Sequence, residues 1–183
     1  MIPPTVTDAA LMRNLRSGSN EAFAELYRRH KDSLYDYCSR LLKDEIQAED
    51  VVHDSFLMLW RDAHTLNSLG SFRSWIFSIA RHKALNCIRD RKSFDELSDD
   101  CSIEHDDPLT IFVRNEQRVL FHDLLEMIRP AYKELIVLKD YEYFSSQEIS
   151  KITGLSIAST RVHLFRARKA LAKEFMKNHG AKR

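Results

Sequence analysis

Basic side chains gather in two stretches of the sequence. Residues 71–92 carry Arg73, Arg81, Lys83, Arg89, Arg91 and Lys92 against the single acid Asp90. At helical spacing we expect an inward face of Phe72, Trp75, Ile76, Ile79, Ala80 and Ala84, and we expect Arg73, Arg81, Lys83, Asn86, Arg89 and Arg91 to lie mostly outside. Residues 157–183 carry eight Lys and Arg side chains against Glu174 alone. Cationic side chains bind phosphate groups, and interleaved rings such as Phe72 and Trp75 suit a strand whose bases can unstack. Both stretches are therefore candidate polyanion sites, although a solvated helix face is the alternative for either stretch alone.

A third stretch, residues 44–62, has the opposite charge: Asp44, Glu45, Glu49, Asp50, Asp54 and Asp62 stand against Arg61. At helical spacing, one inner face is shared by Ala48, Val51, Val52, Ser55, Phe56, Leu59 and Trp60. The outer face then consists of Glu49, Asp50, His53, Asp54 and Leu57. An apolar residue ringed by charge suits contact with another protein, here one with a basic surface. A solvated face with one exposed leucine is the alternative on this pattern alone.

The elements that position these residues are predicted to be helices throughout. The 183 residues include only four Gly and four Pro, which lie between segments of helical periodicity. We expect helices over residues 7–17, 20–42 (with Asn20 as its N-cap), 44–63, 71–91, 108–128 and 131–141, then a two-turn helix and a last helix to about residue 177. A β-sandwich or barrel needs more turn residues. No two glycines lie close enough for a phosphate-binding loop.

The apolar stripe of the helix over residues 20–42, which we interpret as core, includes Tyr27, His30 and Cys38. We interpret His30 and Cys38 as packed residues rather than metal ligands. The cysteines Cys38, Cys87 and Cys101 lack the C-x-x-C spacing of a zinc site or a disulfide framework. We therefore expect no metal and no cofactor. No signal peptide and no apolar run of membrane-spanning length occurs in the sequence, so we expect a cytoplasmic chain without membrane insertion of its own.

Residues 93–108 contain seven acids and no Lys or Arg. A polar, aperiodic segment of one charge is typical of a flexible linker. It divides the chain into two small helical domains, residues 1–92 and 109–183, joined by the acidic linker 93–108.

The C-terminal part has the pattern of a helix-turn-helix. Ser145 and Glu148 form a capping box, Gly154 supplies a left-handed turn, and Ser156 caps the last helix. On that helix we expect Ile157, Leu164, Leu171 and Phe175 to be buried, and Arg161, Val162, Phe165, Arg166 and Lys169 to lie largely outside. Such a helix fits a DNA major groove, where arginines reach guanine edges or phosphates. A generic helical hairpin is the alternative.

Three segments resemble a bacterial RNA polymerase sigma factor of the sigma-70 family: AEDVVHDSFLMLW (48–60), SFRSWIFSIARHKALNCIRDRK (71–92) and SQEISKITGLSIASTRVHLFRARKAL (146–171). The size and layout are similar to the extracytoplasmic-function (ECF) group, which keeps only sigma regions two and four. The resemblance implies an all-α chain without catalytic residues that binds core polymerase and promoter DNA. It also implies control by an anti-sigma factor.

The resemblance assigns roles to three sets of residues. The acidic helix would bind the clamp helices of the largest polymerase subunit through Glu49, Asp50, His53, Asp54 and Leu57. The loop 64–70 and the helix that follows it would melt and hold the minus-ten element through Asn67, Ser71, Arg73, Arg81, Lys83, Asn86 and Arg89. The last helix would read the minus-thirty-five element through Ser159, Arg161, Val162, Phe165, Arg166 and Lys169.

The sequence departs from the family pattern at four places. His53 stands where Gln is usual, and Tyr143-Phe144 replaces a common Gly-Leu. Ser150 and Thr160 occupy helix-turn-helix positions that are more often Ala and Val. These departures put the docking of the recognition helix in question, rather than the family.

Two other functions each match part of the sequence. A stand-alone helix-turn-helix regulator would need neither the acidic face nor a second basic helix. A metal-dependent phosphohydrolase would use the His-Asp pairs at His53, His105 and His122, but His105 lies in the linker, where no preorganised site forms. Cys101 with His105 is a weaker suggestion of a metal or redox role.

Overall fold

The computed structural model describes residues 6–66, 71–95 and 123–179, all of whose regular elements are helical. The elements are α1 (Asp8–Arg16), α2 (Asn20–Leu42), α3 (Glu45–Asp62), the 3-10 turn η1 (Ala63–Thr65), α4 (Phe72–Asp95), α6 (Pro130–Ile136), the π-helical segment η2 (Val137–Tyr141), α7 (Ser146–Thr153) and α8 (Ile157–His179). Within these ranges, none of the helices is long and apolar enough to cross a membrane.

Side-chain caps explain where the first helices begin. Thr7 caps α1 and Asp44 caps α3, each by accepting a hydrogen bond from a backbone N–H of the first turn. Ser19, not Asn20, caps α2, because the Ser19 hydroxyl accepts from the backbone N–H of Ala22. The prediction of Asn20 as the N-cap was therefore wrong by one residue: Asn20 is already the first residue of the helix.

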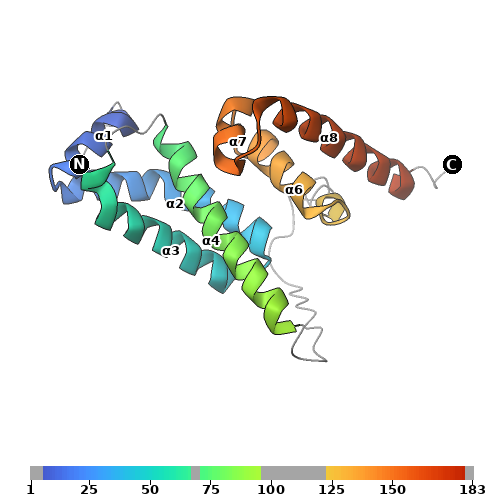
Figure 1. Ribbon diagram of the computed structural model, residues 1–183, viewed down its shortest axis with the longest axis horizontal. Coiled ribbons are helices and arrows are strands. Elements are labelled where there is room, and N and C mark those ends of the chain that lie inside the picture. The colour runs from blue at the N-terminus through green and yellow to red at the C-terminus, as the bar shows by residue number, and fades with distance from the viewer. Residues whose placement is uncertain (1–5, 67–70, 96–122, 180–183) are drawn as a thin grey trace, which may run out of the picture.

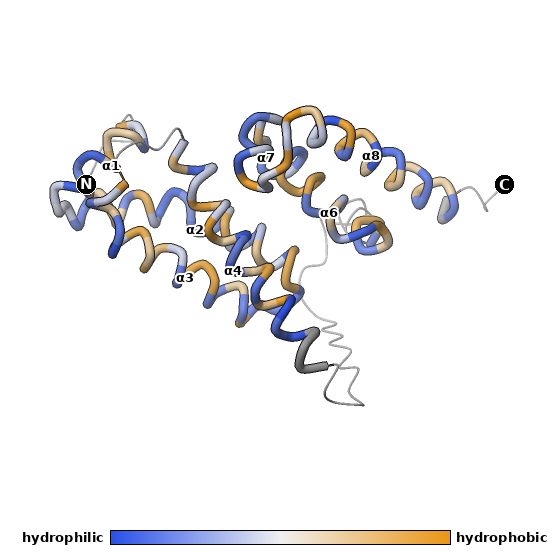
Figure 2. The backbone as a smooth tube through the Cα atoms, viewed as in Figure 1, coloured by the Kyte–Doolittle hydropathy of each residue, from blue (hydrophilic) through white to orange (hydrophobic). Residues whose placement is uncertain are grey.

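Helices α1 to α4 form a bundle, in which α2 packs against α1, α3 and α4 (Figure 1). Fully buried Leu26, Leu34, Cys38 and Leu59 lie in its core. His30 is 8% exposed, so its assignment to the core was correct. Figure 2 shows the apolar residues of these helices facing one another, which is the pattern that the amphipathic spacing predicted.

The second group of helices is α6, η2, α7 and α8. Helix α8 packs along α6, and Leu125, Ile136 and Ala167 form a small core beneath them. Pro130 is the first residue of α6, where its missing N–H costs nothing. The predicted helix over 108–128 is described only for its last turn, since residues 96–122 lie outside the described part of the chain.

The two groups share one continuous core. It joins residues of α1 to α4 to Leu138, Phe144 and Ile149 of the second group, and α7 packs directly against α4 (Figure 1). Phe77 of α4 and Phe144 are both buried and meet edge to face, with ring centroids 4.9 Å apart. Most of the predicted linker lies outside the described residues, but α4 continues through its first three residues, 93–95.

Some residues predicted to be buried are exposed. Ile157 and Phe175 were expected on the buried stripe of the last helix, but 39% and 46% of their surface is accessible. These residues lie near the two ends of α8, whereas its buried residues Leu164 and Ala167 lie between them, where other helices cover it. Trp60, placed on the inner face of α3, is 45% exposed because it lies at the edge of the bundle against Phe23.

Candidate nucleic-acid and protein interfaces

The predicted helix-turn-helix is present, and its turn has the expected geometry. Ser145 and Glu148 form the reciprocal capping box of α7. Burial alone would raise the pKa of Glu148, but hydrogen bonds from Ser145 outweigh it and hold that pKa below its usual range. Gly154 ends α7 at φ 75°, in the left-handed region that favours glycine. Ser156 then caps α8 through the backbone N–H of Ser159.

The two unusual polar residues of this motif satisfy their own hydroxyls. The Ser150 hydroxyl donates to the backbone carbonyl of Leu155 at 2.6 Å, across the turn. Thr160 is fully buried, and its hydroxyl donates to the carbonyl of Ser156 at 3.0 Å. Both hydroxyls are therefore paired, so neither departure leaves an unsatisfied polar group in the motif.

The outer face of α8 is the first candidate interface. Arg161, Arg166 and Lys169 are exposed, and Val162 and Phe165 are 47% and 69% exposed. Within the described part of the chain, none of the three cations has an ion-pair partner. Ser159 is half-buried at the start of this face and is hydrogen-bonded to Ser156. The face thus offers unpaired cations around two apolar side chains, as major-groove recognition requires.

The second candidate interface is α4, where Ser71 caps the helix by accepting from the backbone N–H of Ser74. Arg89 is exposed and Asn86 half-buried. Lys83 pairs with Asp54 of α3 at 2.9 Å. The predicted minus-ten interface on α4 and the predicted polymerase interface on α3 therefore meet at this ion pair. Asn67 lies outside the described residues.

Arg73 and Arg81 were expected to lie mostly outside the fold, and this was wrong. Their side chains are only 32% and 23% exposed, because Glu142 and Glu134 of the second helical group pair with them. Burial would lower the pKa of Arg81, but the hydrogen bonds to Glu134 and the charge of that carboxylate together raise it. The reason lies in the tertiary packing: the segment that includes α6 and η2 covers this side of α4.

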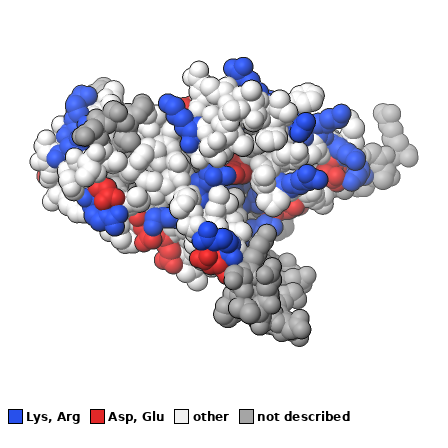
Figure 3. Space-filling view, viewed as in Figure 1, with Lys and Arg blue, Asp and Glu red and all other residues white. Residues whose placement is uncertain are grey.

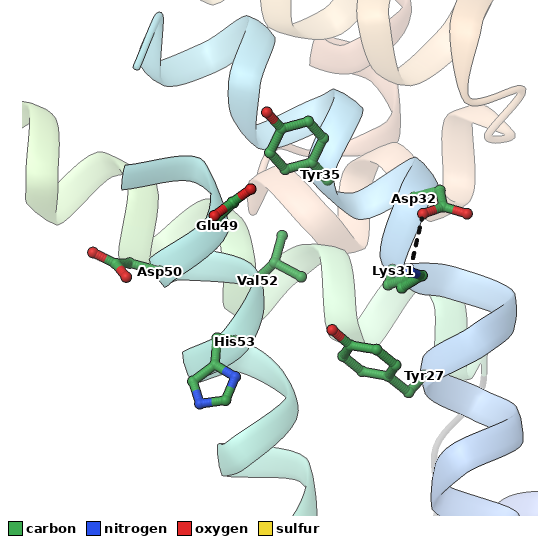
Figure 4. A pocket seen from close by; sticks show the side chains of 8 residues that line it. All are labelled: Tyr27, Lys31, Asp32, Tyr35, Glu49, Asp50, Val52 and His53. Atoms are coloured by element: carbon green, nitrogen blue, oxygen red, sulfur yellow. Dashed lines mark ion pairs between the residues drawn. The ribbon is translucent and has the colours of Figure 1, made fainter. Parts of the chain in front are cut away.

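The third candidate interface is the acidic face of α3. Glu49, Asp50, His53 and Asp54 are all exposed, and Leu57 is 50% exposed among them. A groove of about 490 Å³ runs between this face and α2. Figure 4 shows Glu49, Asp50 and His53 projecting from α3 beside it, with Tyr27, Lys31 and Tyr35 on the α2 side.

The α2 side of this groove was missed in the sequence. Tyr27 was assigned to the core, yet it is 36% exposed. Its ring meets that of Phe56 edge to face, with the ring centroids 4.8 Å apart, and the Lys31 ammonium lies over it. Burial, and then the charges of Glu45 and Glu49, raise the pKa of Tyr35. The sequence did offer a signal for a partly exposed side chain here, namely a tyrosine on an apolar stripe. The ring of a tyrosine can pack against a core while its hydroxyl reaches solvent.

Figure 3 shows acidic side chains along the lower edge of the bundle, with basic ones beside them, and several basic side chains on the second helical group. No group of three or more metal-ligating side chains comes together among the described residues. The His53-Asp54 pair lies on the exposed face of α3, and His105 and His122 fall outside the described ranges.

Comparison with known proteins identifies the family of each helical group. Residues 26–94 match the family described as Sigma-70 region 2, and residues 118–171 match the family described as Sigma-70, region 4. The ECF RNA polymerase sigma factor SigW of Bacillus subtilis is 25% identical over 177 residues, which cover 89% of this chain and 94% of the relative. The RNA polymerase sigma factor CarQ of Myxococcus xanthus is 25% identical over 161 residues, which cover 85% of this chain and 90% of the relative.

Two solved structures share the fold. CnrH, solved with the cytosolic domain of CnrY, superposes with a TM-score of 0.69 at 24% identity over 91% of this chain and 95% of its own. The sigma factor RpoE, solved with the anti-sigma factor NepR from Bartonella quintana, superposes with a TM-score of 0.71 at 23% identity, over 84% of this chain and 96% of its own. At these identities the likeness shows the fold alone.

Proposed function

We propose how this chain, which belongs to the sigma-70 family of RNA polymerase sigma factors and to its ECF group, divides promoter recognition among the three interfaces described above. As a sigma factor it is a transcription initiation factor that works with core polymerase on promoter DNA, and not an enzyme. In our proposal α3 binds the polymerase, α4 binds the minus-ten element, and α8 reads the minus-thirty-five element.

The observation that carries the proposal is the outer face of α8. Arg161, Arg166 and Lys169 are exposed without ion-pair partners among the described residues, whereas Arg168 of the same helix pairs with Asp140 at 2.6 Å. Unpaired arginines beside exposed Val162 and Phe165 supply both guanine-edge donors and apolar contacts for thymine methyl groups. We therefore assign base reading in duplex DNA to this face.

For the minus-ten element we propose α4 and the segment before it. Ser71 and Asn86, which has no hydrogen-bond partner among the described residues, offer polar groups. Arg73, Arg81, Lys83 and Arg89 offer cations for the strand. Because Arg73 and Arg81 are paired with carboxylates in this structure, they reach DNA only after those pairs open.

For the polymerase we propose the acidic face of α3 together with the groove beside it. Glu49, Asp50, His53 and Asp54 provide charge, and Leu57 provides the apolar centre. A basic helical surface on the polymerase fits this arrangement, since complementary charge sets the orientation and the rate of association. We extend the site to Tyr27 and Tyr35, which line the same groove.

We also propose an anti-sigma factor as a partner. The relatives solved as complexes support this: CnrH was solved with the cytosolic domain of CnrY, and RpoE of Bartonella quintana with the anti-sigma factor NepR. Such a partner would cover the polymerase-binding and DNA-binding surfaces.

Run-off transcription tests the proposed function. Core polymerase is incubated with a promoter library, with and without the protein. We expect transcripts that start downstream of a shared pair of motifs and only when the protein is present. Specific binding of duplex DNA by the protein alone, without such transcripts, would favour the stand-alone regulator instead.

A further inference from the structure

The positive charge of α8 continues beyond the face that we assign to base reading. Lys173 is exposed and has no ion-pair partner among the described residues. The next lysine, Lys177, donates to both carboxylate oxygens of Glu174, at 2.8 and 3.1 Å. Met176, just before it, is uncharged and 70% exposed. Within the described part of α8, the series of unpaired lysines and arginines therefore ends at Lys173.

Lys173 lies on the same side of α8 as the residues that we assign to base reading. It follows Val162 by eleven residues and Arg166 by seven. Because an α-helix has about 3.6 residues per turn, both spacings fall within about 20° of a whole number of turns. The three side chains therefore project from one side of the helix, and Lys173 extends the proposed DNA-binding face towards its C-terminal end.

Helix α8 is longer than a major groove is wide. It runs as one helix from Ile157 to His179, which is about 34 Å at a rise of about 1.5 Å per residue (Figure 1). The major groove of B-DNA is about 12 Å wide. The stretch from Arg161 to Lys169 already spans about 12 Å of helix, and Lys173 lies about 6 Å further along. When the first turns of α8 lie against base edges, Lys173 is therefore carried to the phosphates that border the groove.

The order of residue types along α8 fits this division. Among the described residues, the arginines without an ion-pair partner, Arg161 and Arg166, come first. The planar fork of an arginine suits a guanine edge. The lysines without a partner, Lys169 and Lys173, follow. A lysine ammonium is a point charge on a flexible stem, which suits a phosphate and does not distinguish one base from another.

We propose that Lys173 binds a phosphate of duplex DNA beside the bases that α8 reads, and so forms a sequence-independent subsite at the C-terminal end of the DNA-binding face. The inference rests on the assignment of α8 to duplex DNA. Lys173 lies beyond residue 171, where the match to Sigma-70 region 4 ends. A cation that binds a phosphate releases a condensed counterion, so this contact makes affinity depend on salt rather than on sequence.

The test uses the full chain bound to core polymerase and two labelled promoter fragments. One fragment carries the minus-thirty-five motif identified by run-off transcription, and the other carries that motif scrambled. Fluorescence anisotropy measures the affinity for each fragment over a range of KCl concentrations. The variant is Lys173→Gln. The matched control is Lys177→Gln, which removes the same charge one turn further along α8, from a lysine that Glu174 already holds.

We expect Lys173→Gln to weaken binding of both fragments by the same factor, about eightfold at 0.1 M salt, and to make the slope of log affinity against log salt shallower by about 0.9. Both effects follow from the loss of one phosphate contact. Lys173→Arg keeps the charge and should keep the slope. Lys177→Gln should leave affinity and slope unchanged. Circular dichroism checks that each variant keeps its helices.

A loss confined to the fragment with the intact motif would overturn the inference, because Lys173 would then contribute to base reading. An unchanged slope, or an equal change with Lys177→Gln, would overturn it as well.

Arg166→Ala, measured on the same fragments, tests the proposed function separately. It should reduce the preference for the intact motif. If it does so while Lys173→Gln changes nothing, only the phosphate subsite fails. If the preference survives Arg166→Ala while Lys173→Gln changes the slope, the assignment of base reading to Arg166 fails and the phosphate contact stands.

Discussion

Arg166 gives the sharpest test of base reading by α8. It is exposed and makes no ion pair with any described residue, so Arg166→Ala should change the free energy of unfolding by less than about 0.5 kcal/mol. If it contacts a base edge, the same change removes about 1–3 kcal/mol of promoter binding. That loss corresponds to a fall of roughly 5- to 150-fold in transcription at limiting protein.

The chain provides a matched control two residues further on. Arg168 is also an exposed arginine of α8, but its guanidinium is bound to Asp140. An exposed pair of this kind contributes only about 0–1 kcal/mol to stability. Arg168→Ala should therefore leave both folding and promoter use close to those of the unaltered protein.

The assay is run-off transcription from a cognate promoter over a range of protein concentrations, with pull-down of core polymerase as the parallel measurement. Arg166→Ala should lower transcription and leave polymerase binding intact. Equal losses in both variants would mean that α8 acts through its total charge, and full activity of Arg166→Ala would refute its assigned contact.

Three further changes test other parts of the structure. Tyr143 is 83% exposed at φ 55°, so Tyr143→Gly should relieve left-handed strain and stabilise the fold by up to about 1 kcal/mol in urea denaturation. Asp50→Lys should weaken binding to core polymerase about tenfold in a pull-down titration, since it reverses a charge at the centre of the acidic face. A hydrogen bond with His30, together with Arg29, lowers the pKa of Asp8 from its ordinary value of 3.8. The ionised Asp8 therefore stabilises the fold above that value, and this contribution is lost as the pH falls through the lower pKa of the folded state. Asp8→Asn should flatten the loss of stability below about pH 4, measured by urea denaturation over a range of pH.

Each of these changes has its own control. Lys43 shares the left-handed conformation at φ 55° but pairs with Glu126, so Lys43→Gly should gain less stability than Tyr143→Gly. Asp123→Lys changes an exposed acid outside α3 and should leave polymerase binding as it is. Asp32→Asn replaces an exposed acid of α2 and should lose stability below about pH 4 as the unaltered protein does. The same flattening of this loss in both variants would contradict the role of Asp8.

Local features of the fold were readable from the sequence because their causes are local. The capping box of Ser145 and Glu148 and the left-handed turn at Gly154 depend on residues within ten positions of one another. The same holds for the exposure of Leu57, which follows from helical spacing alone. Tyr143 shows the limit of this approach. The sequence identified it as a departure from a common glycine, but only the structure shows that this position has a positive φ, which favours glycine.

The pairing of Arg73 and Arg81 could not be read in the same way. Their partners Glu142 and Glu134 lie 69 and 53 residues away, and on its own helix each of these charges has the pattern of a solvated face. Phe77 was likewise left out of the expected core, because its burial depends on Phe144, which belongs to the other helical group. Helix periodicity predicts which face of a helix is apolar, but not which distant segment covers the rest.

This difference bears directly on function. A cation that can bind DNA phosphates is also available to any carboxylate that the chain brings to it, and the covalent connection raises the local concentration of such a carboxylate. Arg81 illustrates this: the fork that suits a phosphate also suits Glu134, with Tyr37 adding a second donor. Because Arg166 has no such partner among the described residues, the two helices to which we assign DNA binding differ in the availability of their cations, although their basic composition is alike.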